Sequence, residues 1–153
     1  FVHQDLNSIL DYENYSTETF DGGVLQIGIA NQDEQKFSLP PNSPDYGLSV
    51  AAYYFWIFPG LMLNFYPWGL SVNIIVPITV NRTRIIFQGF VGDLSMLGKG
   101  AGGDLDKVEA EDQEIVEATQ KGVSSGLYHR GRYSPTKERG IHHFHMMLTE
   151  HTT

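Results

Sequence analysis

The stretch from Ala51 to Val91 decides the fold, and it reads AAYYFWIFPGLMLNFYPWGLSVNIIVPITVNRTRIIFQGFV. It is rich in β-branched and aromatic residues, and short turn signals interrupt it at Pro59-Gly60, Pro67-Trp68-Gly69 and Thr79-Val80-Asn81. The expected strands between these signals are Ala51–Phe58, Leu61–Tyr66, Leu70–Ile78 and Arg82–Val91. Connections this short join antiparallel neighbours, so the stretch predicts a β-meander.

The segments on either side extend this sheet and then change character. Gly23–Ala30 predicts a further strand, 31–44 a polar surface loop, and 1–22 a loop or a short helix. After a glycine-rich connector, Leu105–Ser124 predicts a helix with Asp106 and Glu109 as a capping box. Ser134-Pro135 then precedes a last helix over Gly140–Glu150. Strands followed by helices predict an α+β domain, with helices on one face of an antiparallel sheet and a ligand pocket between them.

Composition excludes several functions. The chain has 153 residues, enough for one domain, and its formal charge of −8 argues against nucleic acid or an anionic membrane as a partner. It has no cysteine, so it has neither disulfides nor the two thiolates that a Rieske 2Fe-2S cluster needs. Its longest apolar run, Val50 to Phe58, is too short to span a bilayer, and we expect no targeting signal. We therefore expect a cytoplasmic protein. Because the chain begins Phe-Val-His rather than with Met, we also expect a fragment.

Asp112 interrupts the apolar stripe of the expected long helix. Leu105, Val108, Ile115 and Val123 share its face at helical spacing. A carboxylate turned toward a core needs a cation, hydrogen-bond donors or a metal as partner. The residues alone leave three interpretations open: a metal ligand, an ion pair with Arg130 or Arg132, or a helix whose inward face differs from the apolar stripe.

Histidines are the second candidate group. His142, His143 and His145 lie on the expected last helix, where a packed and hydrogen-bonded set is favoured over a metal site. His3, taken alone, has the pattern of an ordinary surface residue.

Aromatic residues gather between Tyr53 and Trp68. Strand alternation places Tyr54, Trp56 and Phe58 on one face of the sheet, and Tyr53, Phe55 and Ile57 on the other. Such a block suits either a core or a pocket for a flat ring or a quaternary ammonium group. We select Trp56, Asn64 and Tyr66 as candidate substrate-pocket residues.

Four motifs in order resemble the C-terminal region of Rieske-type ring-hydroxylating oxygenase α subunits, in the branch that includes choline monooxygenase. They are YFWIFPGLMLNFYPW from Tyr54, VEAEDQEIVEATQKG from Val108, GRYSP from Gly131 and GIHHFH from Gly140. The resemblance implies a helix-grip fold (START/Bet v1-like), with residues 1–153 as part of the mononuclear-iron catalytic domain. It also implies that the Rieske domain, with its 2Fe-2S cluster, lies outside this chain.

The resemblance further implies a site that holds Fe(II) by two histidines and one aspartate, with open positions for O₂ and substrate. Phe1-Val2-His3-Gln4-Asp5-Leu6 looks like the tail of the family's histidine motif. His3 would then be the second iron histidine, the first would lie five residues earlier, and Asp112 would be the aspartate ligand. The implied partners are a small-molecule substrate, O₂, a ferredoxin or reductase as electron donor, and further copies of the chain in a homo-oligomer, a trimer by analogy.

The implied activity is hydroxylation or oxidative demethylation of a small substrate, with a quaternary ammonium favoured over a planar aromatic acid. With two of the three ligands and no Rieske cluster, this chain by itself is expected to be inactive. Two alternatives remain open, a metal-free small-molecule binding module of the same fold and a dimerisation or scaffold role.

Overall fold

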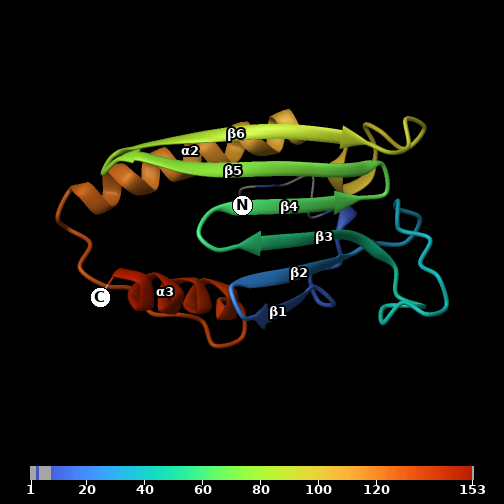
Figure 1. Cartoon of the computed structure of the whole chain (residues 1–153), viewed down its shortest axis with the longest axis horizontal. Coiled ribbons are helices and arrows are strands. Elements are labelled where there is room, and N and C mark those ends of the chain that lie inside the picture. Colours follow the sequence, from blue (N-terminus) through green and yellow to red (C-terminus); the bar gives the residue numbers. More distant parts are fainter. Residues whose placement is uncertain (1–2, 4–7, 153) are drawn as a thin grey trace.

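The computed structural model describes residue 3 and residues 8–152, which form a six-stranded antiparallel sheet with helices on one side (Figure 1). The strands follow one another across the sheet in chain order, as a meander requires. They are β1 (Ser16–Phe20), β2 (Gly23–Ile29), β3 (Val50–Ile57), β4 (Leu61–Tyr66), β5 (Gly69–Thr79) and β6 (Arg82–Val91). A short 3-10 helix, η1 (Gly100–Gly102), leads into α2 (Leu105–Ser124), and α3 (Arg139–Thr152) follows.

Both long helices lie on the same face of the sheet. In Figure 1, α2 runs behind β5 and β6, while α3 lies beside β1 and β2. The ring of Phe144 on α3 meets Trp56 of β3 edge-on, with centroids 4.6 Å apart. Residues that face each other across antiparallel strands point to the same side. This face therefore carries Trp56 and its cross-strand partners, and we call it the inner face.

A buried cluster at one end of the sheet fixes the start of α2. Its members are Leu10, Ala30, Ala51, Ala52, Tyr66, Trp68 and Ala101. The indole Nε1 of Trp68 donates a hydrogen bond to the carbonyl of Gly102 at 3.1 Å. Because Gly102 ends η1 just before α2, this bond and the surrounding apolar contacts tie the first turn of α2 to the sheet.

The predicted architecture is confirmed, with strand and helix ends that agree to within one or two residues. The ends of β4, β6 and α2 coincide with the prediction because turn residues flank the strands, and apolar spacing together with glycine marks the helix.

Three local predictions are wrong or incomplete. The loop or short helix expected over 1–22 misses β1, which shows no apolar alternation because Thr17 and Thr19 supply its less exposed side. Residues 1–2 and 4–7 of that range lie outside the described residues. The N-cap of α2 is Asp104, whose side chain accepts a hydrogen bond from the backbone N–H of Lys107, rather than the Asp106 capping box. Ser134 caps a turn instead of α3, since its hydroxyl accepts from the backbone N–H of Lys137 and α3 begins at Arg139.

Across residue 3 and residues 8–152, no helix has both the length and the apolar character that a membrane span requires.

Candidate metal and substrate site

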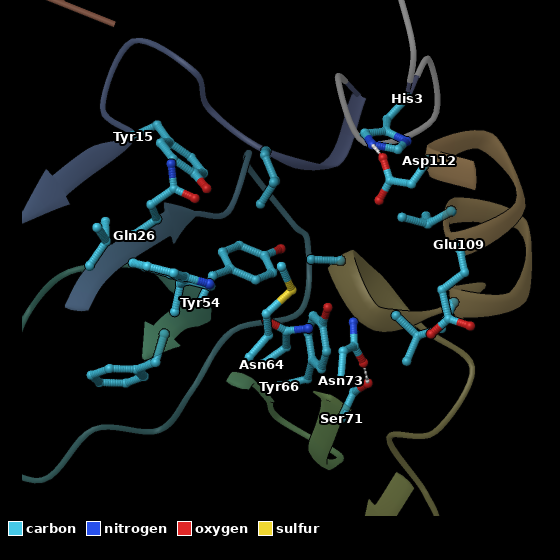
Figure 2. A pocket seen from close by; sticks show the side chains of 18 of the residues that line it. His3, Tyr15, Gln26, Tyr54, Asn64, Tyr66, Ser71, Asn73, Glu109 and Asp112 are labelled. Carbon is cyan, nitrogen blue, oxygen red and sulfur yellow. Dashed lines mark hydrogen bonds and ion pairs between the residues drawn. The ribbon is translucent and has the colours of Figure 1, made fainter. Parts of the chain in front are cut away.

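A cavity of about 400 Å³ lies between the inner face of the sheet and the first turns of α2 (Figure 2). Its floor comes from β2, β3, β4 and β5, and its wall from α2, η1 and the segment around Tyr12 and Tyr15. A concave, partly apolar space of this size is typical of a small-molecule site.

Strand register arranges the floor in two rows. Gln26, Tyr54, Asn64 and Ser71 face one another across four strands, and Val24, Trp56, Met62 and Asn73 form the neighbouring row. Ser71 is buried, and its hydroxyl donates to the side-chain oxygen of Asn73 at 3.2 Å. A hydroxyl and amides on an otherwise apolar sheet face need polar partners. The floor therefore offers hydrogen bonds to a ligand as well as apolar contact.

Tyrosines form one wall of the cavity (Figure 2). The rings of Tyr15 and Tyr54 stack with centroids 6.5 Å apart, and Tyr54 meets Tyr66 edge-on at 5.9 Å. Tyr66 in turn stacks on Trp68 at 5.4 Å. Burial raises the pKa of the Tyr15, Tyr54 and Tyr66 hydroxyls well above the ordinary tyrosine value, so these groups stay neutral at physiological pH. The side of the cavity that these tyrosines form is therefore aromatic and uncharged.

His3 and Asp112 meet at the rim of this cavity (Figure 2). The imidazole Nε2 of His3 lies 3.0 Å from Oδ1 of Asp112. Neighbouring ligand atoms of an octahedral ion with bonds of about 2.1 Å lie about 3 Å apart. The two atoms therefore fit adjacent positions around a single metal ion. Among the residues that the structure describes, no group of three or more histidine, cysteine, aspartate or glutamate side chains is placed to hold a metal ion.

The expected burial of Asp112 is wrong, and the side chain lies beside His3, the residue that the resemblance names as the other iron ligand of this chain. The Asp112 side chain is 61% exposed, and α2 has no buried residue. Leu105 and Val108 are half-buried over the cavity, whereas Ile115 and Val123, farther along the same stripe, are exposed. The stripe is apolar, but the described residues cover it at its first turns and not beyond. Asp112 thus pairs with His3 rather than with Arg130 or Arg132.

Two glutamates on α2 belong to the site and escaped the sequence analysis. Oε2 of Glu111 lies 2.9 Å from Nδ1 of His3. Glu109 lines the cavity, and its pKa is raised by partial burial and by the neighbouring charges of Asp106 and Asp112. Besides its tyrosines, the described lining holds the imidazole of His3 and the carboxylates of Glu109 and Asp112, with no lysine or arginine.

All three predicted pocket residues, Trp56, Asn64 and Tyr66, line the cavity. The polar floor residues Gln26, Ser71 and Asn73 were missed. Ser71 and Asn73 stand two residues apart on an apolar strand, and this spacing is the signal that could have shown them on one face.

The histidines of α3 bind separate partners, as the packing interpretation predicts. Nε2 of His143 contacts the carbonyl oxygen of Phe20 at 3.0 Å. His145 hydrogen-bonds the Tyr133 hydroxyl through Nδ1, and the ring of His142 meets the Tyr133 ring edge-on at 5.1 Å. These imidazoles hold α3 and the segment before it in place.

Several curated proteins are similar in sequence along nearly the whole chain. Choline monooxygenase (chloroplastic) of Arabidopsis thaliana is 29% identical over 97% of this chain and 34% of its own length. The enzyme of the same name from Beta vulgaris is 26% identical over 98% of this chain and 33% of its own length. The chain thus spans about a third of the length of these relatives.

Solved structures share the fold. A quaternary ammonium Rieske monooxygenase, described in connection with carnitine oxidation by gut microbiota, superposes with a TM-score of 0.72 at 20% identity, over 99% of this chain and 43% of that one. An inhibitor complex of the quaternary ammonium Rieske monooxygenase CntA gives 0.73 at 20% identity, over 99% and 42%. The family model of the ring hydroxylating alpha subunit (catalytic domain) matches residues 2–153, and the chain belongs to this family.

Proposed function

We propose that this chain is the mononuclear-iron part of a Rieske-type oxygenase that hydroxylates or oxidatively demethylates a quaternary ammonium compound. The observation that carries the proposal is the 3.0 Å approach of His3 Nε2 to Asp112 Oδ1 at the rim of an aromatic cavity. A histidine and a carboxylate on adjacent positions are two parts of the facial triad that binds non-haem Fe(II).

His3 and Asp112 would each hold one position on the iron, and a second histidine would come from the stretch that the family places before His3. Bound iron supplies O₂ activation in this family of sites. The residues of this chain bind and orient the substrate beside it. Tyr54 and Tyr66 limit the space for the substrate, while Asn64 and Ser71 offer hydrogen bonds to a hydroxyl or carboxyl group.

The cavity suits a cation. Aromatic faces attract quaternary ammonium groups. The described lining carries the carboxylates of Glu109 and Asp112 and no basic side chain other than the imidazole of His3. The names of the relatives, choline monooxygenase and quaternary ammonium Rieske monooxygenase, point to the same substrate class. An anionic aromatic acid would meet carboxylates without a lysine or arginine to bind it.

Electrons must come from outside this chain. When one oxygen atom from O₂ is inserted into a C–H bond, the other atom is reduced to water. This reduction consumes an electron pair and two protons. The chain has no cysteine for a Rieske centre. We propose that a 2Fe-2S cluster in another part of the full-length protein passes on electrons from a ferredoxin or reductase.

Further copies of the protein complete the assembly in this proposal. Inter-subunit electron transfer is described for one of the similar structures, which supports a homo-oligomer. The plant relatives are chloroplastic, so the cytoplasmic location stays a prediction.

The first experiment measures anaerobic Fe(II) binding by the full-length protein and by its H3A and D112A variants. Each substitution should weaken binding by at least about 100-fold, because loss of a mere outer-shell partner already costs about 10–100-fold. H129A and E114A are matched controls, since both side chains are exposed and neither lines the cavity.

Unchanged iron affinity in both H3A and D112A would overturn the metal assignment. If those variants also kept their affinity for a quaternary ammonium ligand, the cavity would be that of a metal-free binding module.

A further inference from the structure

His3 is contacted through both of its ring nitrogens by consecutive residues of α2. Nδ1 lies 2.9 Å from Oε2 of Glu111, and Nε2 lies 3.0 Å from Oδ1 of Asp112. Consecutive side chains on a helix point about 100° apart, so the imidazole sits in the angle between them. The two carboxylates differ in exposure. The Glu111 side chain is 29% exposed and that of Asp112 is 61% exposed.

The two contacts give the two nitrogens different roles once Asp112 is taken as a metal ligand. Ionised carboxylates accept hydrogen bonds and donate none, so without a metal both Nδ1 and Nε2 face an acceptor. With Asp112 as a metal ligand, the metal would take the place of a proton on Nε2, and Nδ1 would keep its proton for Glu111. A neutral imidazole carries one N–H, and when Nδ1 holds that proton the lone pair is on Nε2. Nε2 is the nitrogen that faces Asp112.

We infer that Glu111 is a positioning residue of the iron site, because its carboxylate accepts the Nδ1 proton of His3 and leaves Nε2 as the metal-binding nitrogen. The inference rests on the proposed function. Glu111 acts through His3 and takes no ligand position itself. Carboxylates that accept the second N–H of a metal-bound histidine fix the ring orientation and make the ligand more basic.

The chain position of His3 gives this contact a second consequence. His3 and Glu111 are 108 residues apart in sequence, and His3 contacts α2 through Glu111 and Asp112. With a metal bound on Nε2, the Glu111 contact at Nδ1 would fix the orientation of the imidazole ring. Without that contact the imidazole ring can rotate before the metal binds. Metal binding must then also order the ring, and this lowers the metal affinity.

The test compares E111A and E111Q in the full-length protein. E111A should weaken anaerobic Fe(II) binding by about 10–100-fold. E111Q should weaken it less, since the amide oxygen still accepts the Nδ1 proton without the negative charge. E114A is the control, because Glu114 is an exposed glutamate on the same helix outside the cavity lining.

Proton NMR of the zinc-loaded protein gives a readout separate from affinity. With zinc on Nε2, the Nδ1 proton of His3 should give a signal that exchanges slowly with water, and H3A identifies it among the imidazole signals. In E111A the signal should broaden or disappear through exchange, and in E111Q it should persist.

The outcomes separate the two proposals. If H3A and D112A lose iron while E111A keeps both its affinity and its Nδ1 signal, the role of Glu111 is refuted and the proposed function stands. If H3A and D112A keep iron, the proposed function itself fails. Circular dichroism of each variant checks that the helix is intact.

Discussion

Glu109 brings a carboxylate to the cavity wall, and the described lining has no lysine or arginine beside it. Partial burial and the carboxylates of Asp106 and Asp112 raise its pKa, so all the named causes disfavour its charged form. Iron bound at His3 and Asp112 would offset the charge of Asp112. Glu109 would then be the carboxylate in the described lining that is left to face a cationic substrate.

We predict that E109Q discriminates between charged and neutral ligands. The KM or Kd for choline should rise by roughly 3–10-fold, which corresponds to at most about 1.4 kcal/mol because Glu109 remains partly solvated. The neutral isostere 3,3-dimethylbutanol has the same shape without the charge, so its Kd should not change. Calorimetric titration of both ligands measures the difference.

E114Q serves as the matched control for Glu109, since it removes the same charge from α2 away from the cavity. Equal effects of E109Q on choline and on 3,3-dimethylbutanol would mean that Glu109 shapes the pocket and does not act through its charge.

His3 and Asp112 lie side by side, as the resemblance implied, whereas the buried environment expected for Asp112 was wrong. The pairing came from a motif resemblance, since no local pattern relates residues so far apart. Apolar periodicity shows which face of a helix is apolar, but not whether another element covers it. The contact of Glu111 with His3 depends on where the residue-3 segment lies, which the local pattern of α2 does not encode.

At the scale of elements, the joint between Trp68 and η1 fixes where α2 starts and hence where Glu109, Glu111 and Asp112 lie. Gly102 leaves no room for a side chain at this joint. A Cβ there would lie 2.5 Å from Nε1 of Trp68 and 2.6 Å from Cγ of Tyr66, and both of these rings are buried.

We predict that G102A destabilises the protein by about 1–3 kcal/mol, because the added methyl group overpacks a buried contact. Iron affinity should fall with it as the first turn of α2 shifts. Denaturant unfolding and Fe(II) titration of the same samples measure both effects.

G122A provides the opposite control on the same helix. Nothing lies within 4 Å of a Cβ at Gly122, so alanine should raise stability by about 0.5–1 kcal/mol through its better helix propensity. If G102A proved as harmless as G122A, the joint would not control the position of α2.

The elements also show where local sequence signals suffice. The four strands between Val50 and Val91 are flanked by turn residues and have strong β composition, so alternation located them. β1 was missed because an edge strand with one paired side needs little apolar surface. Both Asp104 and Asp106 are suitable N-caps by composition, and the geometry of η1 selects Asp104.

At the scale of the whole molecule, the proposed metal site links a residue that precedes the sheet in sequence to a helix that follows it. His3 precedes the entire sheet, whereas Asp112 lies on a helix that follows it. Except at its start, α2 is exposed and has no buried residue, so a metal bound between His3 and Asp112 would add a tertiary constraint where packing is sparse. A ligand that binds only the closed arrangement suppresses opening in proportion to its occupancy.

We therefore predict that Fe(II) slows amide hydrogen exchange in the first turns of α2. At a free metal concentration of about 100 times Kd, the opening that breaks the site should become about 100-fold rarer, equal to about 2.7 kcal/mol. Exchange in α3, which packs on β1 and β2, should not change. In H3A the protection of α2 should vanish. Protection that persists in H3A would instead place the metal elsewhere on α2, whose other carboxylates could bind it without the residue-3 segment.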